Sequence, residues 1–114
     1  MSNANKELWE ARLAYFDQLV EQCPDFVRKG KTMPYTSANG HMFSLLNKAG
    51  ELGVRLSKAD GQAFREQYQT GNFTSHGATM RGYVLIPESM YGNDKMLVDL
   101  LQKGFKYVNS LPPK

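Results

Sequence analysis

The segment from Met80 to Lys114 constrains the fold more than any other part of the chain. Its apolar run, Tyr83–Ile86, stops at Pro87, which has no backbone N–H to offer a sheet. An amphipathic stretch follows, and the pair Pro112-Pro113 ends it. Apolar residues recur in that stretch at helical spacing: Leu97, Leu100, Leu101, Phe105 and Val108. This order predicts a buried strand followed by a helix, which Asn93 or Asp94 can cap. Gly104 inside the helix predicts close packing against a neighbour.

Two more helices are predicted before this segment. The first runs from about Asn5 to Gln22, where a broad apolar face recurs every three or four residues, and Pro24 ends it. The second begins after Ser57 and continues to about Thr70. Asp60 stands three residues after Ser57 as a weak capping box, and Gly71 is expected to supply the left-handed cap.

The strand pattern predicts an antiparallel sheet. Asn39-Gly40 is a strong hairpin signal, because both residues tolerate a positive φ. In the third strand Leu52, Val54 and Leu56 alternate with Glu51, Gly53 and Arg55. This alternation predicts one buried face and one solvent-exposed face. A weaker candidate, interrupted by Gly77, precedes the strand that Pro87 closes. The five expected strands are Lys31–Thr36, His41–Leu46, Glu51–Leu56, Phe73–Met80 and Arg81–Ile86.

The predicted order is helix, three strands, helix, two strands, helix. Because the helices must cover a sheet face, the expected class is α+β, with an antiparallel sheet packed by the first and third helices in two layers. We find no internal repeat or linker, and residues 1–114 are expected to form one domain.

Composition excludes several classes of protein. No apolar run approaches the ~20 residues that a bilayer requires, so no membrane partner is expected. The only cysteine, Cys23, cannot form an intramolecular disulfide, and no signal peptide is recognisable, so we expect a cytoplasmic protein. The formal charge of +3 comes from 14 basic and 11 acidic residues, mostly interleaved. That balance is milder than in a dedicated nucleic-acid binder.

Several segments resemble the N-terminal domain of the TfoX/Sxy family, which is associated with the regulation of natural competence in bacteria. Met33 after Arg28, Lys29 and Lys31 resembles the family's Met-Phe-Gly-Gly stretch, although Pro34-Tyr35-Thr36 replaces Phe-Gly-Gly. The other matching segments are Gly40–Phe43, Leu52–Leu56, Met80–Ile86 and Ser110–Lys114. The resemblance covers the chain from about Val27 to its end. It implies the same element order, a regulatory role in competence or transcription, and no catalytic residues.

Few residues suggest chemistry. Arg28, Lys29 and Lys31 form the one basic cluster and are possible phosphate contacts, although a solvated lead-in to a strand is the favoured interpretation. Cys23, His41 and His76 lack metal-ligand or nucleophile spacing, and no nucleotide-binding glycine motif occurs. We therefore expect no catalytic residue, no metal and no cofactor.

Aromatic and methionine side chains offer two further alternatives. Tyr35, Phe43, Phe73 and Tyr83 either form a base-stacking platform or pack as sheet-face core, and the second is favoured. The six methionines either fill the core or make an adaptable binding surface.

Three functions remain open from the sequence. The leading hypothesis is a non-catalytic regulatory or protein-interaction module that forms a homodimer and binds an unknown protein partner. The alternative is a nucleic-acid-associated regulator of competence or transcription, with weak nucleic-acid binding. The last is a small enzyme that uses Cys23 or a histidine, which the missing motifs oppose.

Overall fold

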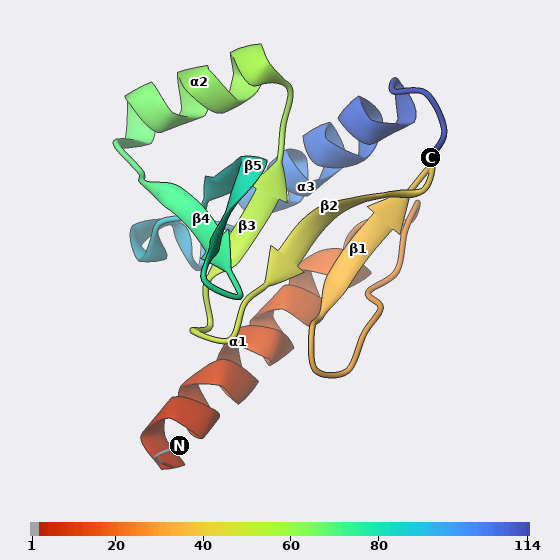
Figure 1. Cartoon of the computed structure of the whole chain (residues 1–114). Helices are drawn as coiled ribbons and strands as arrows, with labels where there is room; N and C mark the ends of the chain where they lie inside the picture. The colour runs from red at the N-terminus through yellow and green to blue at the C-terminus, as the bar shows by residue number, and fades with distance from the viewer. Residues whose placement is uncertain (1–2) are drawn as a thin grey trace.

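The computed structural model describes residues 3–114 and contains, within them, one five-stranded antiparallel sheet and three α-helices (Figure 1). The strand order across the sheet is β1-β2-β3-β5-β4. A short 3₁₀ helix, Glu88–Met90, precedes the last α-helix. The α+β class and the predicted element order are confirmed. The elements are α1 (Asn3–Glu21), β1 (Tyr35–Ala38), β2 (His41–Leu46), β3 (Leu52–Arg55), α2 (Lys58–Tyr68), β4 (Asn72–Ser75), β5 (Ala78–Leu85) and α3 (Asp94–Asn109).

All three helices contribute to one core on one face of the sheet. Helices α1 and α3 run behind the strands in Figure 1. Helix α2, at the top of the view, packs against β5. Val84 and Ile86 face this core, which settles which side of the last strand the helices cover. No helix within residues 3–114 lies on the opposite face, so this part of the chain has the two expected layers. The core's largest fully buried side chains are Phe16, Leu19, Phe43, Leu46, Val84 and Val108.

The two-residue hairpin between β1 and β2 forms where the sequence predicts it. Asn39 and Gly40 have φ values of 57° and 81°, both in the left-handed region that such a turn requires. The first strand was predicted too early, at Lys31–Thr36. The chain instead reverses at Gly30, whose φ is 81°, so that Lys29 and Tyr35 exchange two backbone hydrogen bonds of 2.8 and 2.9 Å. This loop holds Lys31 out of the sheet.

A second two-residue turn, His76-Gly77, joins β4 to β5. The φ values are 53° for His76 and 75° for Gly77. The prediction of one interrupted strand over Phe73–Met80 is therefore wrong, because the interruption is the turn of a hairpin. Asn-Gly, Asp-Gly and Gly-Gly are the strong sequence signals for such a turn, and His-Gly is not among them, which concealed the turn in the sequence.

The ends of α2 agree only in part with the sequence. Ser57 is the N-cap, and its hydroxyl accepts a hydrogen bond of 3.1 Å from the backbone N–H of Asp60. The left-handed C-cap is Gln69, with φ of 50°, rather than the predicted Gly71. The helix therefore ends earlier than Thr70, and β4 begins at Asn72.

Helix α3 lies close against the sheet at Gly104, as predicted. A Cβ at this position would lie 2.9 Å from the carbonyl oxygen of Arg55 and 3.1 Å from Val54 Cγ1. The Phe43 ring would be 3.2 Å away. Only a residue without a side chain allows the helix to approach β3 so closely.

Candidate interaction surface

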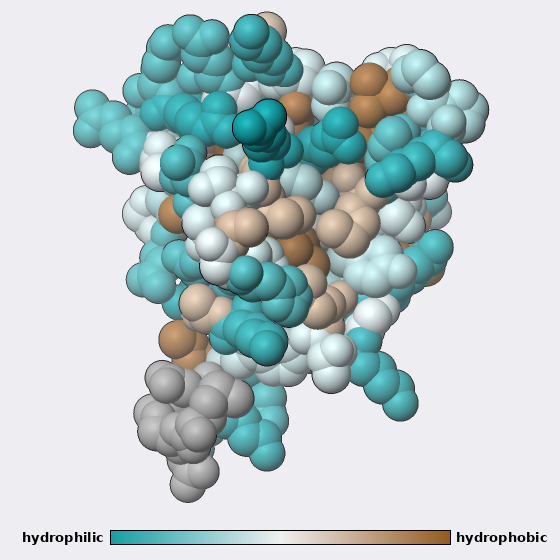
Figure 2. Space-filling view, viewed as in Figure 1, coloured by the Kyte–Doolittle hydropathy of each residue, from teal (hydrophilic) through white to brown (hydrophobic). Residues whose placement is uncertain are grey.

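The helix-free face of the sheet carries a second apolar cluster, here called the open-face cluster. Three of its side chains are buried, with Phe73 fully enclosed, and four are half-buried. The centre of Figure 2, which has the same viewpoint as Figure 1, shows apolar residues surrounded by hydrophilic ones. The cluster consists of Leu45, Phe73 and Tyr83 with Met33, Tyr35, Met80 and Leu85 around them.

Gly53 in β3 makes room for the centre of this cluster. The Phe73 ring lies where a side chain at position 53 would stand, since a Cβ there would be 2.5 Å from the ring. The Phe73 and Tyr83 rings stack at 5.8 Å between centroids with an interplanar angle of 26°. The sequence predicted that one face of β3, including Gly53, is exposed to solvent. This prediction is wrong at Gly53, which is buried.

A β-bulge separates the aromatic residues onto two faces. The pairing of β1 with β2 shifts between Thr36 and Ser37, which leaves Phe43 unpaired and turns it toward the helices. Phe43 packs edge-on against Phe26 at 4.8 Å. Tyr35, Phe73 and Tyr83 lie on the open face instead. The four aromatic residues therefore do not form one base-stacking platform.

The Tyr83 phenol is buried within the open-face cluster. Burial raises the pKa of the Tyr83 phenol to about 12, and the nearby positive charge of Arg55 opposes this only in part. The phenol is neutral at physiological pH. Half-exposed methionine and tyrosine side chains suit protein contact, because methionine adapts its shape and tyrosine is enriched at interfaces.

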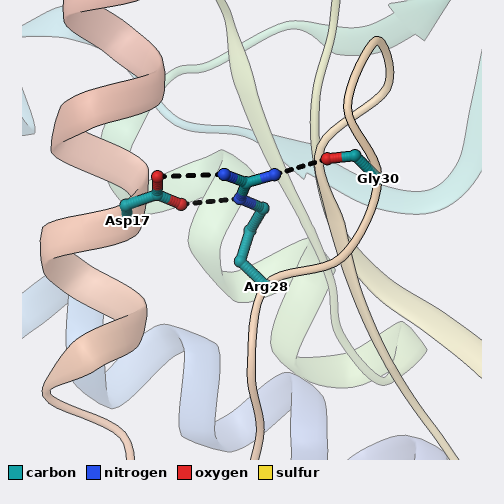
Figure 3. Close-up of polar contacts among 3 residues, drawn as sticks. All are labelled: Asp17, Arg28 and Gly30. Carbon is teal, nitrogen blue, oxygen red and sulfur yellow. Dashed lines mark hydrogen bonds and ion pairs between the residues drawn. The ribbon is translucent and has the colours of Figure 1, made fainter.

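In the basic cluster of Arg28, Lys29 and Lys31, the Arg28 side chain makes structural contacts within the protein (Figure 3). The Arg28 guanidinium binds Asp17 of α1 through two hydrogen bonds, 2.7 Å from Nε to Oδ1 and 3.1 Å from Nη2 to Oδ2. Its Nη1 donates to the carbonyl oxygen of Gly30. The carboxylate raises the pKa of Arg28 further, so the side chain stays charged. Lys29 and Lys31 are exposed.

The three candidate nucleophile or ligand residues have separate partners. Cys23 is buried at the end of α1, where desolvation raises the pKa of its thiol. His41 Nε2 lies 3.0 Å from the carbonyl oxygen of Pro112, whereas His76 Nε2 lies 3.1 Å from the Met33 sulfur. Across residues 3–114, no three His, Cys, Asp or Glu side chains gather as metal ligands would. The structure thus does not bring these three residues together.

The sequence singled out Tyr35, Phe73 and Tyr83, but it did not place them in one cluster with Leu45, Met33, Met80 and Leu85. The signal available in the sequence was that β5 has apolar residues on both of its faces. A strand in a sheet that is covered on one face needs apolar residues on that face only. None of the helices in the described part of the chain combines the length and apolar character needed to cross a membrane.

Comparison with known proteins adds no assignment. No protein-family model matches the chain, and no curated protein sequence matches it.

Proposed function

We propose that this protein is a non-catalytic interaction module that acts by binding protein through the open-face cluster. The observation that carries the proposal is an apolar sheet face that no helix in the described part of the chain covers, whereas α1, α2 and α3 pack on the other side. Its buried centre and its surrounding hydrophilic residues resemble the arrangement of core and rim in protein interfaces.

The partner that we propose for the purified protein is a second copy of the chain. A two-fold axis through the cluster would place each apolar side chain against the same surface of the other copy, and symmetric dimers are the commonest oligomers. In the cell, another protein could cover the same face. The resemblance to the TfoX/Sxy N-terminal domain supports a regulatory role and no catalysis.

Light scattering after size-exclusion chromatography, across a concentration series, tests this proposal. We expect a mass of twice the 12.9 kDa chain. Met80→Glu, which places a charge in the half-buried part of the cluster, should give a monomer. Thr79→Glu is the matched control, because Thr79 is exposed on the same strand and lies outside the cluster. A wild-type chain that stays monomeric at high concentration, or equal effects of both variants, would contradict the proposal.

A nucleic-acid-associated role in competence or transcription is the second proposal. The exposed Lys29 and Lys31 support it, together with the family resemblance. Arg28 contributes less, because Asp17 and Gly30 already accept three of its five N–H donors. Fluorescence anisotropy with a labelled duplex should show weak binding that is lost by physiological salt, since each neutralised phosphate releases counterions. Tight, sequence-selective binding that Lys29→Gln with Lys31→Gln abolishes would instead favour this role over the first.

A further inference from the structure

Four cationic side chains line one pocket of about 570 Å³ beside the start of α2. They come from three different elements, which explains why they do not appear as a charge run in the sequence. Arg55 ends β3, Lys58 and Arg65 belong to α2, and Arg81 lies on β5. The rest of the lining, which includes Tyr107 from α3, contains no acidic residue.

None of these four cations has an ion-pair partner in the part of the chain that the structure describes. The ion pairs found there are Lys6–Glu10, Arg12–Glu88 and Arg28–Asp17. Like charges that line one pocket repel one another, and a bound anion would offset this repulsion. The lining of this pocket therefore carries four positive charges that no acidic residue of the lining compensates.

The adjoining cleft between α2 and α3 provides an internal comparison. It has a volume of about 420 Å³ and contains charged residues of both signs, namely Asp60, Asp99, Lys95 and Lys103. The two clefts share only Leu56. Mixed charge is thus the pattern in one cleft, and unbalanced positive charge is specific to the other.

Two of the three arginines, Arg55 and Arg65, are half-buried, and contacts with the protein hold both of them in place. Arg65 Nη2 donates to the carbonyl oxygen of Tyr83 across 2.9 Å, and its Nε is buried without an acceptor among the described residues. The Arg55 guanidinium lies 5.6 Å from the centre of the Tyr107 ring. Guanidinium groups that are fixed before a ligand arrives lose less entropy on binding it.

Gly82 lies against the Arg55 side chain. A Cβ there would be in ordinary contact with Arg55, 3.6 Å from Cγ and 3.7 Å from Nε, and the φ of 84° is the reason that glycine is favoured at this position. The Gly82 carbonyl also accepts a 3.0 Å hydrogen bond from the backbone N–H of Leu56. Backbone geometry therefore sets the wall of the pocket, and the arginine lies along it.

We propose that this pocket binds the phosphate group of a small phosphorylated molecule. Arginine forks match phosphate oxygens with paired hydrogen bonds, and lysine adds a mobile positive charge. The volume lies in the range of small-ligand sites, and the Tyr107 ring offers a flat apolar surface beside the cations. The pocket shares no side chain with the open-face cluster, although Arg55 is the cross-strand neighbour of Tyr83, so the variants that test the pocket are placed at Lys58 and Arg81 and leave every side chain of the cluster in place.

Isothermal titration calorimetry with pyrophosphate and with ADP tests the proposal on the whole chain. Pyrophosphate supplies the phosphate chemistry alone, and ADP adds a planar base. We expect saturable binding of at least one of them. Lys58→Gln and Arg81→Gln should each weaken that binding about tenfold, the value of one charge-assisted hydrogen bond. Both residues are exposed, so these variants are expected to fold.

Lys95→Gln and Lys103→Gln are the matched controls, because they remove the same charge from the adjoining cleft. They should leave binding unchanged. Equal weakening by all four variants would reduce the effect to net charge and overturn the proposal. The proposal would also be overturned if neither pyrophosphate nor ADP bound. This holds even if a single-stranded oligonucleotide bound the same pocket, because the ligand would then be a nucleic acid and not a small molecule.

Discussion

The side-chain amide of Asn39 donates a hydrogen bond to the carbonyl oxygen of Val108 across 2.9 Å. The same nitrogen donates to the carbonyl oxygen of Leu111 across 2.8 Å. The turn between β1 and β2 thereby supplies the donor for the Leu111 carbonyl oxygen and a second donor for the Val108 carbonyl oxygen, which also accepts from the backbone N–H of Leu111 across 3.2 Å. The backbone N–H of Lys114 returns a bond of 3.2 Å to the Asn39 carbonyl oxygen. One residue thus makes the hairpin and also fastens the last helix to it.

Asn39→Gly should lower the free energy of unfolding by about 1–3 kcal/mol, because both side-chain hydrogen bonds are lost and the Leu111 carbonyl oxygen loses its donor. Glycine keeps the positive φ of the turn, and its greater freedom in the unfolded chain adds to the loss. Urea denaturation measures the change. Asn39→Asp, which keeps the shape and removes the donors, should be destabilised as well. Wild-type stability in both variants would show that the two bonds contribute nothing.

Leu46→Ala and Leu85→Ala compare the two faces of the sheet with identical chemistry. Leu46 is fully buried in the main core, so its truncation should cost about 2–5 kcal/mol. Leu85 is half-buried in the open-face cluster, and we expect about 1 kcal/mol. Both losses follow from denaturant midpoints at an unchanged m-value. An equal loss at both positions would indicate that the open face is as closely packed as the main core.

Gly104→Ala should destabilise the protein although alanine is the better helix former. Overpacking against the Arg55 carbonyl oxygen, 2.9 Å from the new Cβ, costs about 1–3 kcal/mol and exceeds the gain in helix propensity of about 1 kcal/mol. Gly61→Ala in α2 is the matched control, because its Cβ would meet only atoms at 3.7 and 3.8 Å. That variant should be as stable as the wild type or more so, and thermal melts distinguish the two.

Tyr83 predicts a loss of stability at alkaline pH. Its pKa is about 12 in the folded protein, above the ordinary value of 10.0, so the folded state retains the phenolic proton longer than the unfolded state does. The stabilisation is complete below pH 10 and disappears as the pH rises toward 12, and it amounts to about 3 kcal/mol. Tyr83→Phe, which has nothing to ionise, should lose less stability over this range. Parallel pH profiles for the two proteins would contradict the assignment.

Local patterns in the sequence predicted most of the fold. The Asn39-Gly40 turn, the end of β5 before Pro87 and the apolar face of α3 each depend on neighbours within a few residues. The errors occurred where backbone conformation came from residues that do not signal it. His76 and Gln69 adopt positive φ, which is uncommon for residues other than glycine.

The open-face cluster and the cationic pocket could not be predicted from the sequence, because both are formed by contacts between residues that are far apart in the chain. The Phe43 bulge moved one aromatic ring to the helix side, and pairing brought Phe73 and Tyr83 together on the other side. Likewise, Arg55 and Arg81 are far apart in the sequence but line one pocket. Spacing identified the elements, and the sheet register determined which side chains meet.

The ring of Phe73 over Gly53 makes these two positions mutually dependent over evolutionary time. A larger residue at position 53 would displace the ring, and a smaller residue at position 73 would leave a hollow over the middle strand. Either replacement alone should destabilise the protein, whereas an exchange at both positions can preserve the filled volume. Substitutions at 53 and 73 should therefore arise as pairs among descendants of a common ancestor, and they should pass through an intermediate of lower fitness.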